Sequence, residues 1–180
     1  YDLASVSKVV GVGTIFAFLF QQGKIDIDRP LASYYPDMEQ AEVTIRQLLT
    51  HTSGLDPFIP GRDDLDAEGL KEALHRLKLK DSRQFHYTDV NFLLLGFLLE
   101  KWFGQDLEQI FQEQVFAPWQ MKETTFGPVS QAVPTLRGLP AGVVHDPKAR
   151  VLGVHAGSAG LFSTIKDMEI FLEHYLQDPF

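Results

Sequence analysis

The sequence predicts a mainly α-helical globular domain. Its composition, 44% hydrophobic and 22% charged residues, is typical of a chain that folds around a core. Six segments carry apolar residues at helical spacing, whereas the alternation expected of a half-buried strand is scarce. The expected helices cover about residues 5–22, 44–51, 68–77, 88–103, 106–115 and 164–177.

The first expected helix is apolar almost all round. Valine, isoleucine, leucine and phenylalanine residues between Val9 and Phe20 leave no polar stripe, and Gly23 is suited to ending the helix. A helix of this kind is expected to run through the interior of the protein.

Local signals mark the ends of further elements. Thr44 and Gln47 have the spacing of a capping box, in which each side chain accepts from the other residue's backbone N–H. Thr88 or Asp89 is expected to cap the fourth helix. Residues 127–160 are rich in Gly, Pro, Ala and Val without clear periodicity, so we expect them to form a loop.

Charge and composition exclude several classes of function. Sixteen Lys and Arg against 24 Asp and Glu give a net charge of -8, the wrong sign for a nucleic-acid partner. The chain has no Cys, and its six His are scattered without metal-ligand spacing, so no metal site is expected. The apolar runs 9–20 and 92–99 are shorter than the ~20 residues of a transmembrane helix.

Two Ser-Xaa-Xaa-Lys sequences, 5–8 and 163–166, bear on catalysis. Residues three apart share one helix face, so the lysine amine lies beside the serine hydroxyl and can take its proton when the amine is uncharged. Ser5 and Lys8 open the apolar helix, where burial favours an uncharged amine. They are equally consistent with an ordinary capped helix start, which is the reading we favour for residues 163–166.

A tyrosine hydroxyl near a lysine can relay a proton, and two Tyr-Xaa-Asp sequences occur. Tyr35 lies in a proline turn and is expected to be a surface residue. Tyr87 precedes an apolar helix, so it either directs its hydroxyl into an interior cleft or packs its ring with a solvated tip.

The histidines are interpreted as solvated or turn residues. The exceptions to consider are His145, Asp146 and His155, which could line a pocket in the glycine-rich loop because loops often carry functional residues.

In this order along the chain, the motifs resemble those of the serine β-lactamase and penicillin-binding protein superfamily. The chain is most similar to the class C branch, which includes D-alanyl-D-alanine carboxypeptidases and esterases. The similarity spans nearly the whole chain. It is carried by residues 2–8, 23–30, 44–55, 87–89 and 160–167.

The resemblance implies an α/β sandwich with an inserted helical domain. It also implies that Ser5 is the acylated nucleophile, Lys8 its general base and Tyr87 the proton relay, with the backbone N–H of Ser5 as one oxyanion donor. The implied substrate is an ester or amide: a β-lactam, a cell-wall D-Ala peptide or a small ester. Neither a metal nor an organic cofactor is implied, and a bacterial cell-envelope or secreted location is favoured.

The sequence departs from the family pattern at two points. Asp89 stands where the branch carries Asn, and a carboxylate cannot donate an amide's hydrogen bond to a substrate carbonyl unless it is protonated. We therefore expect Asp89 in the substrate site and inefficient β-lactam hydrolysis. The third motif, Lys or His-Xaa-Gly on an edge strand, should follow residues 160–164, whereas the matching letters at 155–157 precede that segment and predict a loop.

Residues 1–180 are accordingly interpreted as an internal portion of one β-lactamase-like domain, mostly its helical region, with two of three catalytic motifs. Two other functions compete with a hydrolase. One is a penicillin-binding receptor or catalytically dead scaffold of the same superfamily. The other is a helical interaction domain in which Ser5 only caps a helix.

Overall fold

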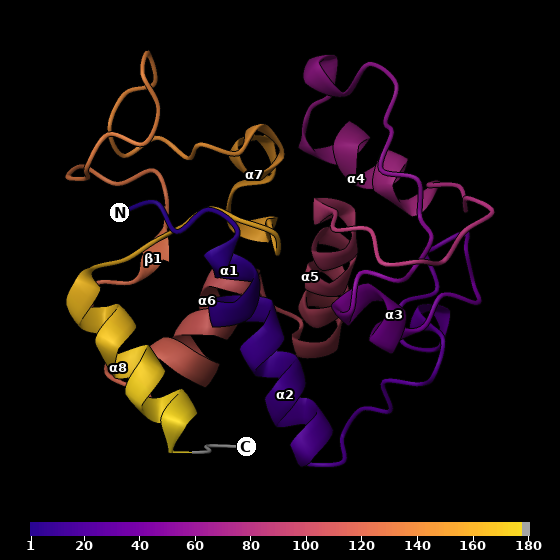
Figure 1. Ribbon diagram of the computed structural model, residues 1–180, viewed down its shortest axis with the longest axis horizontal. Coiled ribbons are helices and arrows are strands. Elements are labelled where there is room, and N and C mark those ends of the chain that lie inside the picture. The colour runs from indigo at the N-terminus through magenta and orange to yellow at the C-terminus, as the bar shows by residue number, and fades with distance from the viewer. Residues whose placement is uncertain (178–180) are drawn as a thin grey trace.

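The computed structural model describes residues 1–177 as a set of helices with one small sheet (Figure 1). This confirms the mainly helical fold for the described residues. The α-helices are α1 (Val6–Lys8), α2 (Thr14–Gln21), α3 (Ile45–Leu49), α4 (Ala67–His75), α5 (Asp89–Phe103), α6 (Leu107–Phe111), α7 (Pro147–Leu152) and α8 (Ile165–Leu176). The π-helical segments are η1 (Val9–Gly13) and η4 (Gln112–Phe116), and the 3-10 turns are η2 (Leu31–Ser33), η3 (Arg62–Asp64) and η5 (Gly153–His155).

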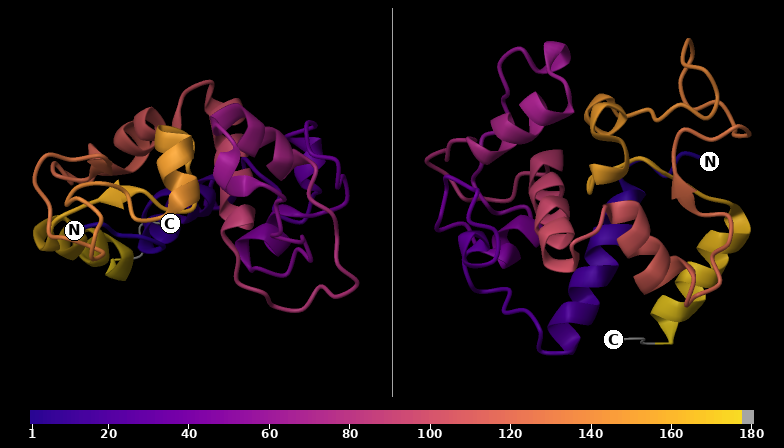
Figure 2. Two further views of the ribbon diagram at one scale, coloured as in Figure 1. Left: turned by 90° about the horizontal axis from the view of Figure 1, so that it is seen from above. Right: turned by 180° about the vertical axis from the view of Figure 1, so that it is seen from behind.

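Helices α1 and α2 run through the middle of the molecule (Figure 1). Helices α3, α4 and α5 lie on one side of them, and α6, α8 and the sheet lie on the other, as the view from behind also shows (Figure 2). Helix α5 packs against α3, α4, α6 and η1, so it joins the two sides. Its residues from Val90 to Leu99 are all buried, which accounts for its nearly continuous apolar sequence.

The first expected helix forms, but it is interrupted and only partly interior. The π-helical segment η1 separates α1 from α2, and Gly23 follows α2 with a φ of 63°, as expected of a helix-ending glycine. Side chains such as Phe16 are buried, whereas Val9 and Phe20 are 51% and 53% exposed. The helix therefore runs through the interior, as expected, but part of its surface is exposed within residues 1–177.

The expected helix starts are confirmed. Gln47 N donates to Thr44 Oγ1 at 3.2 Å and Thr44 N donates to Gln47 Oε1 at 3.0 Å, which completes the capping box of α3. Thr88, rather than Asp89, occupies the N-cap of α5. Thr164 caps α8, so the second Ser-Xaa-Xaa-Lys sequence lies at a capped helix start, as expected.

The stretch 127–160 is not all loop. It contains α7, whose N-cap Asp146 accepts from Ala149 N at 2.8 Å and whose first residue is Pro147. An N-cap aspartate followed by proline is a recognised helix start, so the expectation of a loop was wrong for these residues. His155 is the last residue of the turn η5, and residues 156–157 follow it. None of the three forms a strand, as expected.

The sheet consists of β1 (Thr125–Phe126) and β2 (Leu161–Phe162), which pair antiparallel with Thr125 opposite Phe162. Two residues are too few to show a strand's alternation in the sequence. Within residues 1–177, no helix combines the length and hydropathy that a bilayer crossing requires.

Candidate active site

Ser5 occupies the N-cap position of α1, yet its side chain caps nothing. Instead, Lys8 Nζ lies 3.0 Å from Ser5 Oγ and donates a hydrogen bond to it. Ser5 is exposed, whereas Lys8 is only 3% exposed. The spacing therefore places a buried amine directly beneath an accessible hydroxyl, and the reading of Ser5 as an ordinary helix cap was wrong.

The turn before Ser5 is held in an unfavourable conformation. Ala4 has a φ of 46°, in the left-handed region, which costs a residue with a Cβ about 1–2 kcal/mol. Asp2 Oδ1 stabilises the turn by accepting from Ala4 N at 2.8 Å, and Leu3 N donates to Leu161 O at 2.9 Å. Side-chain and β2 contacts thus fix the position from which Ser5 starts the helix.

The Lys8 ammonium has two further partners. Nζ donates to Asp89 Oδ1 at 2.7 Å and to the carbonyl oxygen of Ser158 at 3.0 Å. With Ser5, these partners account for the three hydrogens that a lysine ammonium can donate. Lys8 can act as a base toward Ser5 only when its amine is uncharged.

Glycine permits the contact with Ser158. A Cβ at Gly157 would overlap the carbonyl oxygen of Phe92 and lie 3.1 Å from the Cα of Gly96 on α5. The absence of side chains at both glycines lets the 156–160 loop lie directly on α5, where its carbonyl reaches Lys8.

Asp89, the first residue of α5, is shared between two lysines. Its Oδ1 pairs with Lys8, and its Oδ2 lies 3.1 Å from Nζ of Lys148 on α7. Burial alone would raise the pKa of the Asp89 carboxyl, but the hydrogen bonds and charges of the two lysines outweigh it and lower that pKa below its ordinary value. Asp89 is therefore a carboxylate at neutral pH. Lys148 is not among the site residues that the sequence predicts, because residues 127–160 lack a clear helical periodicity.

Tyr87 lies beside Lys8 but presents its ring rather than its hydroxyl. The Lys8 Nζ is 5.0 Å from the centroid of the Tyr87 ring, a cation–π contact. The side chain is half exposed, and its hydroxyl has no hydrogen-bond partner among residues 1–177. Of the two predicted arrangements, the structure has the packed ring with a solvated tip.

His51 completes the surroundings of Tyr87, although the sequence indicated a solvated histidine. It is only 9% exposed, and its ring centroid lies 4.6 Å from that of Tyr87. Asn91 Nδ2 donates to His51 Nδ1 at 3.0 Å, and Asn91 Oδ1 accepts from Ser53 Oγ at 2.7 Å. Because Nδ1 accepts a hydrogen bond, the ring proton of neutral His51 is on Nε2.

The chain matches the family model described as Beta-lactamase over residues 1–179. It belongs to the beta-lactamase family. A putative D-alanyl-D-alanine carboxypeptidase of Escherichia coli (strain K12) is 28% identical over 98% of this chain and 50% of its own length. The chain thus spans about half the length of the curated relatives it matches.

Solved structures show the same fold at low sequence identity. FmtA from Staphylococcus aureus has a TM-score of 0.78 at 20% identity, covering 98% of this chain and 52% of its own. A beta-lactamase/D-alanine carboxypeptidase from Yersinia pestis has a TM-score of 0.73 at 22% identity, covering 97% and 53%. A D-amino acid amidase from Ochrobactrum anthropi has a TM-score of 0.71 at 22% identity, covering 98% and 57%.

The other candidates in this beta-lactamase-family chain lie outside the cluster around Lys8. Tyr35 is 3% exposed, so the expectation of a surface tyrosine was wrong, and its hydroxyl lies 2.7 Å from His75 Nε2. His155 Nδ1 pairs with Glu100 at 2.6 Å, and His145 is exposed. Of the loop residues, Asp146 alone approaches the cluster, at 3.7 Å from Lys148 Nζ.

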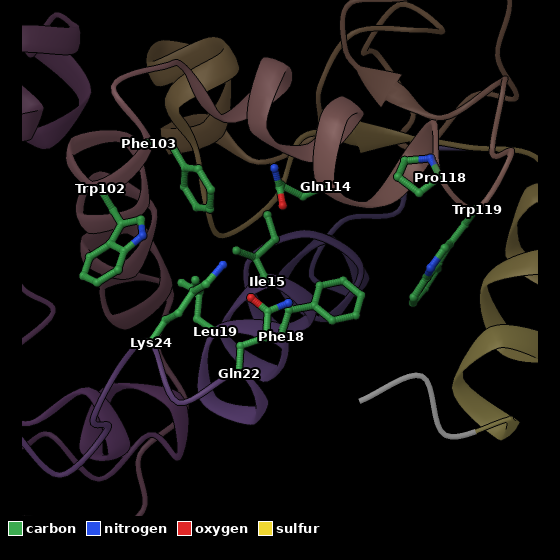
Figure 3. A pocket seen from close by; sticks show the side chains of 10 residues that line it. All are labelled: Ile15, Phe18, Leu19, Gln22, Lys24, Trp102, Phe103, Gln114, Pro118 and Trp119. Atoms are coloured by element: carbon green, nitrogen blue, oxygen red, sulfur yellow. The ribbon is translucent and has the colours of Figure 1, made fainter.

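A cavity of about 250 Å³ lies at the other end of α2 from Ser5 (Figure 3). Phe18, Trp102 and Trp119 contribute aromatic walls, and Lys24 reaches into it. It contains none of the residues around Lys8, so it is separate from the candidate active site of this beta-lactamase-family chain.

Buried His51 is expected to make folding stability depend on pH. Burial, and to a smaller extent the charge of Lys8, lower its pKa from the ordinary 6.5. The unfolded chain therefore binds this proton more readily, so the stabilisation is complete above about pH 6.5 and falls as the pH drops through the native pKa. The free energy of unfolding, measured with urea at about pH 7.5 and about pH 5.5, should change less between these pH values in His51→Phe than in the wild type.

His75, whose pKa burial also lowers, acts with the same sign and is present in both proteins. The difference between them therefore isolates His51. An equal pH dependence of the free energy of unfolding in both proteins would contradict the role given to His51.

Proposed function

We propose that the chain carries the nucleophile of a serine hydrolase that forms an acyl-enzyme on an ester or amide. The observation that carries the proposal is the buried Lys8 Nζ 3.0 Å from the exposed Ser5 Oγ. The family membership supports it, as do relatives named carboxypeptidase, amidase and beta-lactamase. A β-lactam, a cell-wall D-Ala peptide or a small ester is the proposed acyl donor.

The proposed reaction begins with proton transfer from the hydroxyl of Ser5 to the neutral amine of Lys8. The oxygen then attacks the acyl carbon, and the backbone N–H of Ser5 serves as one donor to the developing oxyanion. As the acyl bond breaks, the leaving group takes the proton that Ser5 gave to Lys8, by way of the Tyr87 hydroxyl. Water then attacks the acyl carbon and gives up a proton to Lys8 by the same route. The acid is released as the Ser5 oxygen takes that proton back.

The same geometry supports one other candidate, an acylated receptor or inactive scaffold. Lys8 Nζ lies within hydrogen-bond distance of three oxygens, that of the Asp89 carboxylate among them, and an amine that holds its proton there is not a base. If Lys8 keeps this proton, Ser5 reacts slowly or not at all. Acylation and turnover must therefore be measured separately.

As part of this proposal, the chain supplies the helical portion and two of three motifs of a β-lactamase-like α/β sandwich, and the third motif lies elsewhere in the protein. Experiments should therefore use both this chain and the longest natural form that contains it.

The proposal is tested by intact mass after exposure to a fluorophosphonate and, separately, to a penicillin, with Ser5→Ala as the control. We expect one adduct per chain, mapped to the peptide that contains Ser5 and absent from Ser5→Ala. An adduct that decays while product accumulates supports a hydrolase, and one that persists supports the receptor. No adduct in either form of the protein would overturn the catalytic proposal.

Tyr87→Phe is expected to impair turnover at least 10-fold and to leave folding intact, because it keeps the ring against Lys8 and His51 and removes only the hydroxyl. Product formation and urea unfolding are the two measurements. Tyr35→Phe is the matched control, since it removes the hydroxyl of the chain's other Tyr-Xaa-Asp sequence. Full turnover in Tyr87→Phe would remove Tyr87 from the mechanism.

A further inference from the structure

The Asp89 carboxylate sits between two ammonium groups. One oxygen lies 2.7 Å from Lys8 Nζ and the other lies 3.1 Å from Lys148 Nζ. The Lys148 side chain is only 14% exposed, so solvent screens this contact less than it screens a surface ion pair. Lys148 also lines a cavity of about 230 Å³ between η3, α4 and α7.

Among the described residues, charged or titratable groups face this cluster from five places in the fold, one of them η3, whose Arg62 and Asp63 line the same cavity as Lys148. Helix α1 supplies Lys8, and the start of α7 supplies Lys148 with Asp146, whose Oδ2 is 3.7 Å from Lys148 Nζ. The end of α3 supplies His51, and the segment before α5 supplies Tyr87. From the 156–160 loop, the contact is the uncharged carbonyl of Ser158.

A carboxylate that faces one lysine alone holds the proton of that lysine strongly. When a second ammonium shares the carboxylate, it offsets part of the negative charge and also repels the first ammonium. Lys148 therefore acts on Lys8 through Asp89, although it has no hydrogen bond to Lys8 or to Ser5 among the residues described.

We propose that Lys148 is a positioning residue that sets the pH at which Lys8 can serve as the base for Ser5. By occupying the second oxygen of Asp89, it weakens the hold of that carboxylate on the Lys8 proton. The proton leaves Lys8 for solvent before reaction, and the vacated lone pair then takes the proton of the Ser5 hydroxyl. The catalytic part of this inference rests on the proposed function.

The first test is the pH profile of Ser5 acylation by a fluorophosphonate. In Lys148→Ala, the midpoint of the rise in rate with pH should move up by about 1 pH unit, because Asp89 then acts on Lys8 alone. In Asp89→Asn, it should move down by about 1 pH unit, because Lys8 loses its anionic partner. Lys148→Arg keeps the charge and should restore the wild-type midpoint.

The matched control is Arg150→Ala. This variant removes one positive charge from the same helix, but the exposed Arg150 contacts the carbonyl of His145 and not Asp89. Its midpoint should equal that of the wild type. An equal shift in Arg150→Ala and Lys148→Ala would reduce the effect to net charge and overturn the role of Lys148.

The second test needs no acylation. The protonation of Lys8 is followed by NMR of its 13Cε in lysine-labelled protein, with Lys8→Arg identifying the resonance. The pH midpoint of the Lys8 titration should rise in Lys148→Ala and fall in Asp89→Asn. Unmoved midpoints would overturn the inference even if Ser5 is acylated. Moved midpoints without acylation would leave the coupling established and count against the proposed function instead.

Discussion

Lys8→Ala is expected to slow the acylation of Ser5 about 10²–10⁴-fold at neutral pH, the range typical of a lost general base. The variant removes the amine 3.0 Å from Ser5 Oγ and leaves the hydroxyl with no other basic group in contact among residues 1–177. The measurement is the rate of fluorophosphonate adduct formation by intact mass, with urea unfolding to confirm that the variant folds.

Lys166→Ala is the matched control for Lys8→Ala. It alters the lysine of the second Ser-Xaa-Xaa-Lys sequence, which is exposed and belongs to the capped start of α8. Acylation should be unchanged in this control. A folded Lys8→Ala variant that is acylated at the wild-type rate would remove Lys8 from the mechanism.

Gly157→Val is expected to reduce both stability and acylation. The added side chain would overlap the carbonyl of Phe92 and lie within 3.0 Å of Val12 Cγ2, so the 156–160 loop must move away from α5. Overpacking of this kind costs about 1–3 kcal/mol, measurable by urea unfolding. The same movement withdraws the Ser158 carbonyl from Lys8, so the rate of adduct formation should fall as well.

Gly61→Val separates this crowding from the general effect of losing a glycine. Gly61 has a φ of 64° and nothing within 4 Å of an added Cβ. The Gly61→Val variant should have a free energy of unfolding about 1–2 kcal/mol lower than the wild type, through backbone strain, and the wild-type rate of acylation. If Gly157→Val matched the wild type in both measurements, the close contact between loop and helix would be irrelevant to the site.

The local parts of the structure followed from the sequence because their causes are local. The capping box at Thr44 and the Ser5–Lys8 contact depend on residues three apart, which any helix brings together. The helix α7 was also within reach, since Asp146 and Pro147 mark its start. The sequence allows either Thr88 or Asp89 as the cap of α5, and the structure assigns the cap to Thr88.

The parts that could not be predicted depend on tertiary packing. No local pattern indicates that Asp89 meets both Lys8 and Lys148, or that His51 is buried beside Tyr87. Tyr35 shows the same limit, because its proline turn indicates a surface position while packing against His75 buries it. Burial of single polar residues is decided by which helices meet, and spacing along the chain does not encode that.

The partners of Lys8 come from widely separated parts of the chain. Asp89 lies 81 residues away in sequence and Ser158 lies 150 residues away. Contacts across such distances form only after long segments of chain have been brought together, at a cost in loop-closure entropy. The Ser5–Lys8 pair is thus available from the first turn of helix, whereas its electrostatic setting arises only once most of the chain is folded. If Ser5 is acylated as proposed, its labelling should recover only as the tertiary structure forms, and the fraction of chains labelled then counts the correctly folded molecules in a preparation.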